Sequence, residues 1–98
     1  MSSFFDITAS DKPVLVDFFA DWCGPCKAMS PILKEVKESM GDKIKLLKVD
    51  VEKNQRLATA LNVQGVPTLV LYKNSQILWR QSGMIPKRDI VSKINEYL

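Results

Sequence analysis

The apolar residues of this chain change their spacing at one point, and that change restricts the fold more than any other feature. Residues 14–20 (VLVDFFA) form a β-branched and aromatic run, which is typical of a strand buried on both faces. From Cys26 onward, apolar residues recur every three or four positions with charged residues between them, which indicates an amphipathic helix that ends near Gly41. A buried strand that leads directly into a helix is the beginning of a βαβ unit.

The rest of the pattern extends this unit to the order strand, helix, strand, helix, strand, strand, helix. The later elements are expected at residues 44–51, 57–61, 68–72, 76–80 and 86–98. Asn74 and Ser75 separate the last two strands, which suits an antiparallel hairpin, and Pro86 is placed to begin the last helix. We therefore expect a single α/β domain over residues 1–98, with a parallel, right-handed first βαβ unit.

The composition excludes several classes of function. The chain has no histidine, which removes Ser-His-Asp catalysis, Cys-His proteolysis and imidazole metal ligation. Its two cysteines cannot complete a tetrahedral zinc site alone, so no metal is expected. The 14 basic and 11 acidic residues are scattered, and the net charge of +3 comes from no basic block, so no nucleic-acid partner is expected.

The distribution of apolar residues also predicts where the protein works. Residues 1–12 contain neither a basic start nor an apolar stretch of signal-peptide length, and no later run approaches the roughly 20 apolar residues that span a bilayer. We expect a cytoplasmic protein without membrane contact, in a compartment that keeps thiols reduced.

The segment Trp22-Cys23-Gly24-Pro25-Cys26 lies where the first strand gives way to its helix. A cysteine at a helix N-terminus faces unpaired backbone amides and the positive end of the helix dipole, which favour the thiolate, so Cys23 is the predicted nucleophile. Cys26 lies one turn further along the same face and is the predicted resolving thiol. Gly24 permits the tight entry into the helix, and Pro25 fixes the backbone where a missing N–H costs little.

Three simpler interpretations of the cysteine pair compete with redox chemistry. The pair could be a structural disulfide, half of a metal site shared between two chains, or two inert core thiols. A structural cross-link between residues three apart closes too small a loop to stabilise much. In a cytosolic α/β chain, this spacing favours a redox-active dithiol.

Several separated motifs together resemble the thioredoxin family. They are VDFFADWCGPCK at residues 16–27, KVDV at 48–51, GVPT at 65–68 and the glycine Gly83, so the resemblance covers the chain from about Pro13 to Leu98. The resemblance implies a mixed sheet flanked by helices and reduction of protein disulfides. It also implies that no prosthetic group is bound and that electrons come from NADPH through a thioredoxin reductase.

The resemblance assigns roles to two charged residues. Asp17 lies in the middle of the first strand, where burial of a carboxylate is costly and raises its pKa. In thioredoxins the matching aspartate lies beneath the dithiol, which makes Asp17 the predicted general base for Cys26. Taken alone, an outward-facing strand residue is the alternative interpretation of Asp17. Lys48 matches a lysine beside that carboxylate, although the pattern alone indicates only a strand lysine that reaches solvent.

The resemblance also predicts how substrate is bound. Pro67 matches a cis-proline that lies against the dithiol and leaves the preceding backbone free to pair with an extended substrate, although a proline that merely starts a strand would fit the pattern too. The expected docking surface around Cys23 is flat and mostly apolar. Five residues are expected to form it: Trp22, Gly24, Val66, Gly83 and Met84. Trp79 is expected to be structural.

The chain departs from the family in its first residues. Thioredoxins usually begin with a further strand and a longer helix, and the segment before Asp17 is too short for both. We expect a four-stranded sheet that lacks the usual first strand, with residues 4–7 packed as a helical turn. The strand that begins at Ile44 then becomes an exposed edge, where Lys43, Lys45 and Lys48 discourage pairing with another chain.

The predicted function is therefore a thiol–disulfide oxidoreductase that reduces protein disulfides, works as a monomer and is recharged by a separate reductase. Two alternatives stay open. The same fold can serve a disulfide oxidase or isomerase, because the reduction potential sets the direction of exchange. A binding module on a thioredoxin-like fold would not need the dithiol at all.

Overall fold

The structure, a computed structural model, describes residues 2–98 and confirms the expected order of elements. In chain order the elements are α1 (Ser2–Thr8), β1 (Val14–Phe19), α2 (Gly24–Met40), the short 3-10 helix η1 (Gly41–Lys43), β2 (Lys45–Asp50), α3 (Gln55–Ala60), β3 (Thr68–Lys73), β4 (Gln76–Ser82) and α4 (Lys87–Asn95). Gly41 ends α2 with a φ of 56°, as expected of a glycine at this position. None of the helices described is long and apolar enough to cross a membrane.

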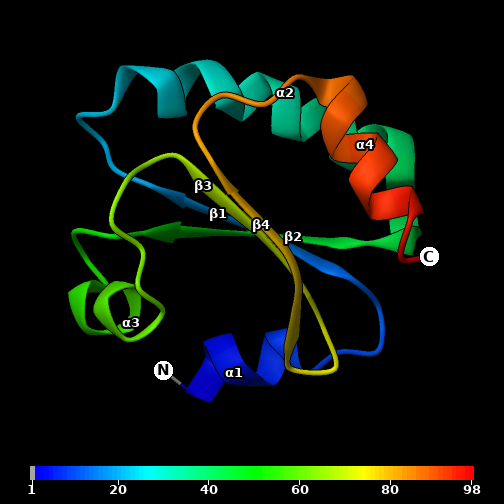
Figure 1. The fold of residues 1–98 in the computed structure, drawn as a ribbon, viewed down its shortest axis with the longest axis horizontal. Helices are drawn as coiled ribbons and strands as arrows, with labels where there is room; N and C mark the ends of the chain where they lie inside the picture. Colours follow the sequence, from blue (N-terminus) through cyan, green and yellow to red (C-terminus); the bar gives the residue numbers. More distant parts are fainter. Residues whose placement is uncertain (1) are drawn as a thin grey trace.

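The four strands form one mixed sheet in the order β2-β1-β3-β4 (Figure 1). β1 pairs in parallel with β2, which places Asp17 opposite Lys48, and antiparallel with β3. β3 and β4 form the predicted hairpin. Asn74 and Ser75 in its turn both have positive φ, 53° and 67°, which is the geometry of a type I′ turn.

The prediction that the usual first strand is missing is confirmed. Across residues 2–98 the sheet has four strands, and β2 is one of its edges. The N-terminal residues form the helix α1 and do not pair with β2. Lys43, Lys45 and Lys48 are exposed along or beside this edge, where their charges oppose pairing with a further strand.

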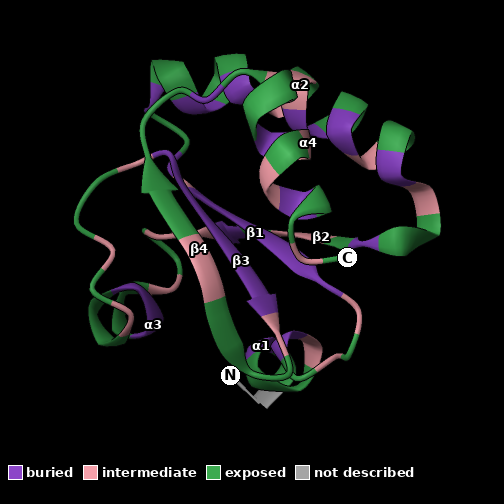
Figure 2. Ribbon diagram, turned by 45° about the vertical axis from the view of Figure 1, so that its right-hand side comes forward, coloured by how far each residue is buried: buried purple, intermediate pink, exposed green. Residues whose placement is uncertain are grey.

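Helices cover both faces of the sheet, and the central strands are buried between them (Figure 2). Because side chains alternate along a strand, β1 contributes Leu15 to the face under α2 and α4, and Val14, Val16 and Phe18 to the face that packs on α1 and α3. Each of these side chains is fully buried, and such burial stabilises the folded state by roughly 2 kcal/mol per side chain.

Three chain segments meet at one end of the sheet and position the site. β1 ends there, β3 begins there opposite Phe18, and β4 ends there because Ser82 pairs with Thr68. The N-terminus of α2 lies above the same end, as Figure 1 shows. Residues far apart in sequence are thereby placed around the start of α2.

Candidate active site

Cys23 occupies the cap position before the first turn of α2. Its backbone is extended, and its Sγ accepts a hydrogen bond of 3.1 Å from the backbone N–H of Cys26. The Cys23 N–H in turn donates to the Ala20 carbonyl at 3.1 Å. Gly24 and Pro25 form the start of the helix, where the missing proline N–H leaves no hydrogen bond unmade. This sulfur therefore lies at the positive end of a 17-residue helix.

The two cysteines are joined as a disulfide, and their Cα atoms are 5.2 Å apart. Both residues are almost completely buried, at 3% and 5% exposure. They pack with Ala20 in a small cluster that Phe19, Val51 and Val66 border. The structure thus holds the pair in its oxidised form, in a mostly apolar setting.

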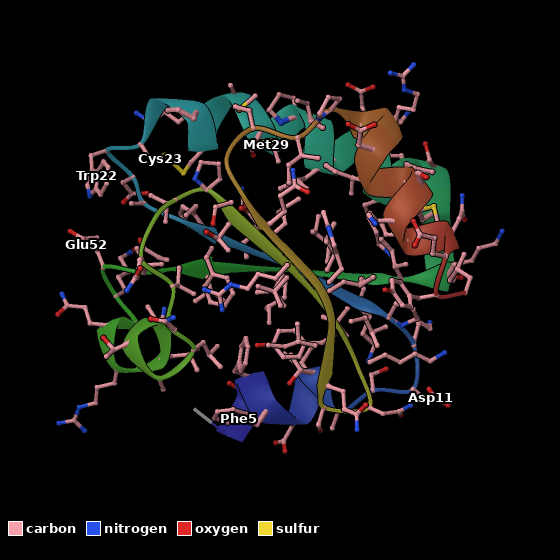
Figure 3. The ribbon with its side chains drawn as sticks, viewed as in Figure 1. Phe5, Asp11, Trp22, Cys23, Met29 and Glu52 are labelled. Atoms are coloured by element: carbon pink, nitrogen blue, oxygen red, sulfur yellow. A yellow bond between two sulfur atoms is a disulfide. The ribbon has the colours of Figure 1, made fainter. Side chains whose placement is uncertain are left out.

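Trp22 directly precedes Cys23 and is 68% exposed. Figure 3 shows both residues at the start of α2. Met84 is exposed as well, and Gly83 adopts a φ of 95°, a conformation that side-chain-bearing residues rarely take. Of the expected docking residues, Val66 is the one that packs directly on the cysteine cluster. The buried disulfide is therefore in contact with Val66, and it directly follows the exposed Trp22 in the chain.

The peptide bond between Val66 and Pro67 is cis, as the resemblance implied. Two hydrogen bonds hold this segment: the Thr68 hydroxyl donates to the Gly65 carbonyl at 2.6 Å, and the Gly83 N–H donates to the Pro67 carbonyl at 2.9 Å. The segment before β3 is therefore held by one hydrogen bond to Thr68, the first residue of β3, and by one from Gly83, the residue that follows β4.

Asp17 is buried, with 1% of its surface exposed. It lies between Leu15 and Phe19 on β1 and so shares their face of the sheet. Within residues 2–98, neither of its carboxyl oxygens has a hydrogen-bond partner. Burial raises the pKa of this carboxyl to about 6, and the nearby charge of Lys48 opposes the rise.

Lys48 is opposite Asp17 in the β1–β2 register, but its ammonium group contacts other residues. Its Nζ donates to the Ser30 hydroxyl at 3.0 Å and lies 5.2 Å from the centre of the Phe19 ring. Cys26, Ser30 and Lys48 all line one recess beside the disulfide. The structure therefore brings Lys48 to the edge of the cysteine site.

Sequence reasoning missed three residues that support this site: Ser30, Val51 and Thr68. Ser30 follows Cys26 by one helical turn, and this spacing was a usable signal. Thr68 follows Pro67 directly, within a motif already identified. Val51 ends the KVDV motif, but its contact with the cysteine cluster could not be predicted from that motif, because the contact depends on how β2 pairs with β1.

No group of three or more potential metal ligands occurs in the described part of the chain. The two sulfurs of Cys23 and Cys26 are the reactive groups that the site brings together. A disulfide between residues three apart, with one sulfur at a helix N-terminus, can accept two electrons and return them by thiol exchange.

Comparison with known proteins places this arrangement in a family. The thioredoxin family model matches residues 2–96. Thioredoxin Y, chloroplastic, of Oryza sativa subsp. japonica is 44% identical over 91% of this chain, and the thioredoxin of Bacillus subtilis is 39% identical over 96% of this chain and 90% of its own length. A solved mutant thioredoxin from Halobacterium salinarum superposes with a TM-score of 0.90 at 35% identity, covering 99% of this chain and 84% of that one.

The chain covers different fractions of the relatives' own lengths. The chain spans 53% of the rice relative, about half its length. The bacterial and archaeal relatives are instead matched over most of their length, and the matched region includes the disulfide, the cis-proline segment and the four-stranded sheet. The chain belongs to the thioredoxin family.

Proposed function

We propose that this protein reduces disulfide bonds in other proteins by dithiol exchange at Cys23 and Cys26. The observation that carries the proposal is the disulfide at the N-terminus of α2, bordered by Val66 and the cis-Pro67 segment. A buried pair beside an exposed apolar rim suits a site that must contact a protein surface before it exchanges electrons.

The first step is attack by Cys23. In the reduced form, the Cys26 N–H that now bonds the Cys23 sulfur would stabilise a thiolate, and the dipole of α2 adds to this effect. The thiolate attacks one sulfur of the substrate disulfide and forms a mixed disulfide with it. The other substrate sulfur leaves as a thiolate and takes up a proton from solvent.

The second step is release by Cys26. The Cys26 thiol gives up its proton, and the resulting thiolate attacks Cys23 of the mixed disulfide. The bond between Cys23 and the substrate breaks, so the substrate leaves fully reduced and the Cys23–Cys26 disulfide forms. We assign to Asp17 the role of the base that accepts the proton of Cys26. A buried carboxylate with a pKa of about 6 is a competent base near neutral pH. Lys48 opposes the rise of that pKa and so keeps Asp17 largely ionised.

The docking surface is assigned to Trp22, Val66, Gly83 and Met84 around Cys23. Exposure of Trp22 and Met84 supports this assignment, because single large apolar side chains at 68% and 49% exposure are available to a partner. The backbone before Pro67 would pair with an extended segment of the substrate, as in strand addition. Gly24 and Pro25 contribute by fixing the turn that presents Cys23.

The oxidised pair must be recharged, since each turnover leaves a disulfide. We infer that a thioredoxin reductase does this with electrons from NADPH, and that the protein works as a monomer in a reducing compartment. For this chain we propose the cytoplasm. The rice relative, by contrast, is named as a chloroplastic protein.

A redox titration in dithiothreitol buffers tests the proposal. Fluorescence of Trp22 and Trp79 reports the state of the pair, and thiol trapping confirms the end points. A two-electron transition clearly more reducing than the glutathione pool is expected, since about 30 mV corresponds to about 1.4 kcal/mol for this couple. A much more oxidising midpoint would instead favour an oxidase or isomerase. Absence of any reversible transition would favour a binding module.

Trapping of substrates tests the separate roles of the two cysteines. Cys26→Ser is expected to accumulate mixed disulfides on Cys23, because attack proceeds and release does not. Cys23→Ser is the matched control and is expected to trap nothing. If Cys23→Ser trapped substrates and Cys26→Ser did not, the two roles would have to be exchanged.

A further inference from the structure

Arg80, which the proposed mechanism does not use, contacts the chain where it leaves α3. Its Nη1 donates to the Leu61 carbonyl at 2.6 Å, and its Nη2 donates to the Asn62 carbonyl. Arg80 belongs to β4 and is 18 or more residues away from these carbonyls in sequence. The two planar N–H groups of one guanidinium thus bind two successive backbone oxygens, a geometry that a lysine cannot reproduce.

The end of α3 explains why these two carbonyls are free to accept. The Val63 N–H bonds to the Ala58 carbonyl at 2.9 Å and the Asn62 N–H to Thr59 at 3.0 Å, while Asn62 adopts a φ of 57°. This is a Schellman motif, which satisfies carbonyls within the last turn but leaves those of Leu61 and Asn62 without helical partners. The positive charge of Arg80 also suits the C-terminal end of a helix.

The segment 62–67, which we call the docking loop, runs from this motif to the cis-proline. Val66 in this loop packs on the cysteine cluster. The far end of the loop is held by the hydrogen bond from the Gly83 N–H to the Pro67 carbonyl. Arg80 and Gly83 are three residues apart, so the same stretch of chain holds both ends of the loop. In Figure 1 the end of β4 lies beside β3, and the docking loop runs from α3 to the start of β3.

We propose that Arg80 is a positioning residue that sets the docking loop for protein substrates. It acts through the backbone of Leu61 and Asn62 and does not touch the disulfide. The inference rests on the proposed function, because it assumes that the backbone before Pro67 pairs with substrate. A loop released at its α3 end can still reach the substrate, but it must first be ordered, and that cost weakens binding without changing the exchange chemistry.

Lys37 offers a matched control. Its ammonium group also binds two backbone carbonyls, those of Gly41 at 2.7 Å and Ile44 at 2.8 Å, at the opposite end of α2 from the cysteines. Arg80→Met and Lys37→Met each remove a cation from two carbonyls. Only the first of these changes touches the docking loop.

The experiment compares both variants with the unchanged protein in two reactions. The first is reduction of insulin, a protein disulfide, and the second is reduction of dithiobis-nitrobenzoate, a small disulfide that cannot pair with the loop. For Arg80→Met we expect KM for insulin to rise about three- to tenfold with kcat within about twofold, while the small disulfide reacts at the unchanged rate. Lys37→Met should leave KM for insulin unchanged, and Arg80→Lys should recover part of the loss because it restores charge without the planar fork.

Hydrogen exchange of the amides at residues 63–66 gives a second readout. It should become faster in Arg80→Met and stay unchanged in Lys37→Met. Equal KM values for the two methionine variants, or an equal loss of rate with the small disulfide, would overturn the positioning role. If the unchanged protein failed to reduce insulin, the proposed function itself would fail, so the two failures are distinguishable. Should Arg80→Met not fold, the KM of Arg80→Lys alone decides, and an unchanged value would contradict the inference.

Discussion

Each face of the sheet buries one polar side chain whose terminal atoms have no hydrogen-bond partner within residues 2–98. On the face that bears Leu15, this group is the Asp17 carboxyl, with a pKa raised to about 6. On the opposite face it is the Tyr72 hydroxyl, and burial raises its pKa above the ordinary value of 10.0. The carboxyl therefore changes charge near neutral pH and the hydroxyl does not. The buried polar group of one face is therefore suited to proton transfer near neutral pH, whereas that of the other face is not.

The largest predicted effect is the loss of stability caused by Phe4→Ala, a change on the face that bears Tyr72. Phe4 is 3% exposed, and its ring meets that of Tyr72 edge-on at 5.7 Å, so its loss leaves a cavity in the aromatic cluster. The free energy of unfolding should fall by about 3 kcal/mol, measured by urea denaturation. The reduction potential of the cysteine pair should not change, because Phe4 packs on the face away from Asp17.

Phe5→Ala is the matched control for this change, since Phe5 is the next residue and is 54% exposed. It should cost less than about 1 kcal/mol. A reduction potential that shifted with Phe4→Ala would show that the two faces are coupled, and the comparison would then break down.

The second prediction concerns Asp17→Asn. The ordinary pKa of this carboxyl is 3.8 and folding raises it to about 6, so its stabilising contribution is complete below about 4 and is lost as pH rises toward 6. The difference of about two pKa units corresponds to about 3 kcal/mol. Asp17→Asn should therefore gain stability relative to the unchanged protein by up to that amount between pH 4 and pH 8. Urea denaturation at a series of pH values measures it.

Asp21→Asn is the control, because Asp21 is exposed and close to the same site. Removing this surface carboxylate should change the free energy of unfolding by less than about 0.5 kcal/mol. The base role adds a kinetic expectation: Asp17→Asn should slow release of the mixed disulfide near neutral pH more than it slows the attack by Cys23. Equal slowing of both steps would remove Asp17 from that role.

The sequence alone predicted the parts of the fold that short patterns specify. The apolar run of β1, the helical spacing of α2 and the position of the Cys23–Cys26 pair at their junction are local, and so they were predicted. The four-stranded sheet was predicted from the family resemblance, because the residues given before Asp17 are too few for the further strand and longer helix with which thioredoxins usually begin. Each of these features depends on residues that are neighbours in the chain.

Features that depend on strand register could not be predicted in the same way. The contact of Val51 with the cysteine cluster requires that β2 pair in parallel with β1. The bonds from Arg80 to Leu61 and Asn62 require both the hairpin register and the left-handed turn at Asn62. The family resemblance assigned Lys48 to the neighbourhood of Asp17, but its actual bond to Ser30 depends on packing between β2 and α2.

The third prediction, Tyr72→Phe, tests the other face. Removing the hydroxyl removes a buried polar atom that has no partner within residues 2–98 and leaves the ring contacts in place. The free energy of unfolding should rise by up to about 1 kcal/mol, and the effect should be the same at pH 5 and pH 8 because a neutral group is replaced. A loss of more than about 1 kcal/mol would show that the hydroxyl is satisfied in solution.

The smallest effect is expected from Lys48→Met. This variant tests whether the charge of Lys48 lowers the pKa of Asp17. Lys48 lowers the pKa of Asp17 against the larger effect of burial, so its removal should raise that pKa further above 6. Carbon chemical shifts of the Asp17 carboxyl, followed by NMR through the titration, measure the change. Lys45→Met is the control, because Lys45 is an exposed lysine on the same strand and pairs opposite Val14. An Asp17 pKa that did not rise in Lys48→Met would mean that the ammonium group, bonded to Ser30 and placed over Phe19, is too well screened to act on the carboxyl. In that case burial alone would set the protonation of Asp17, and Lys48 would serve only to hold α2 against β2.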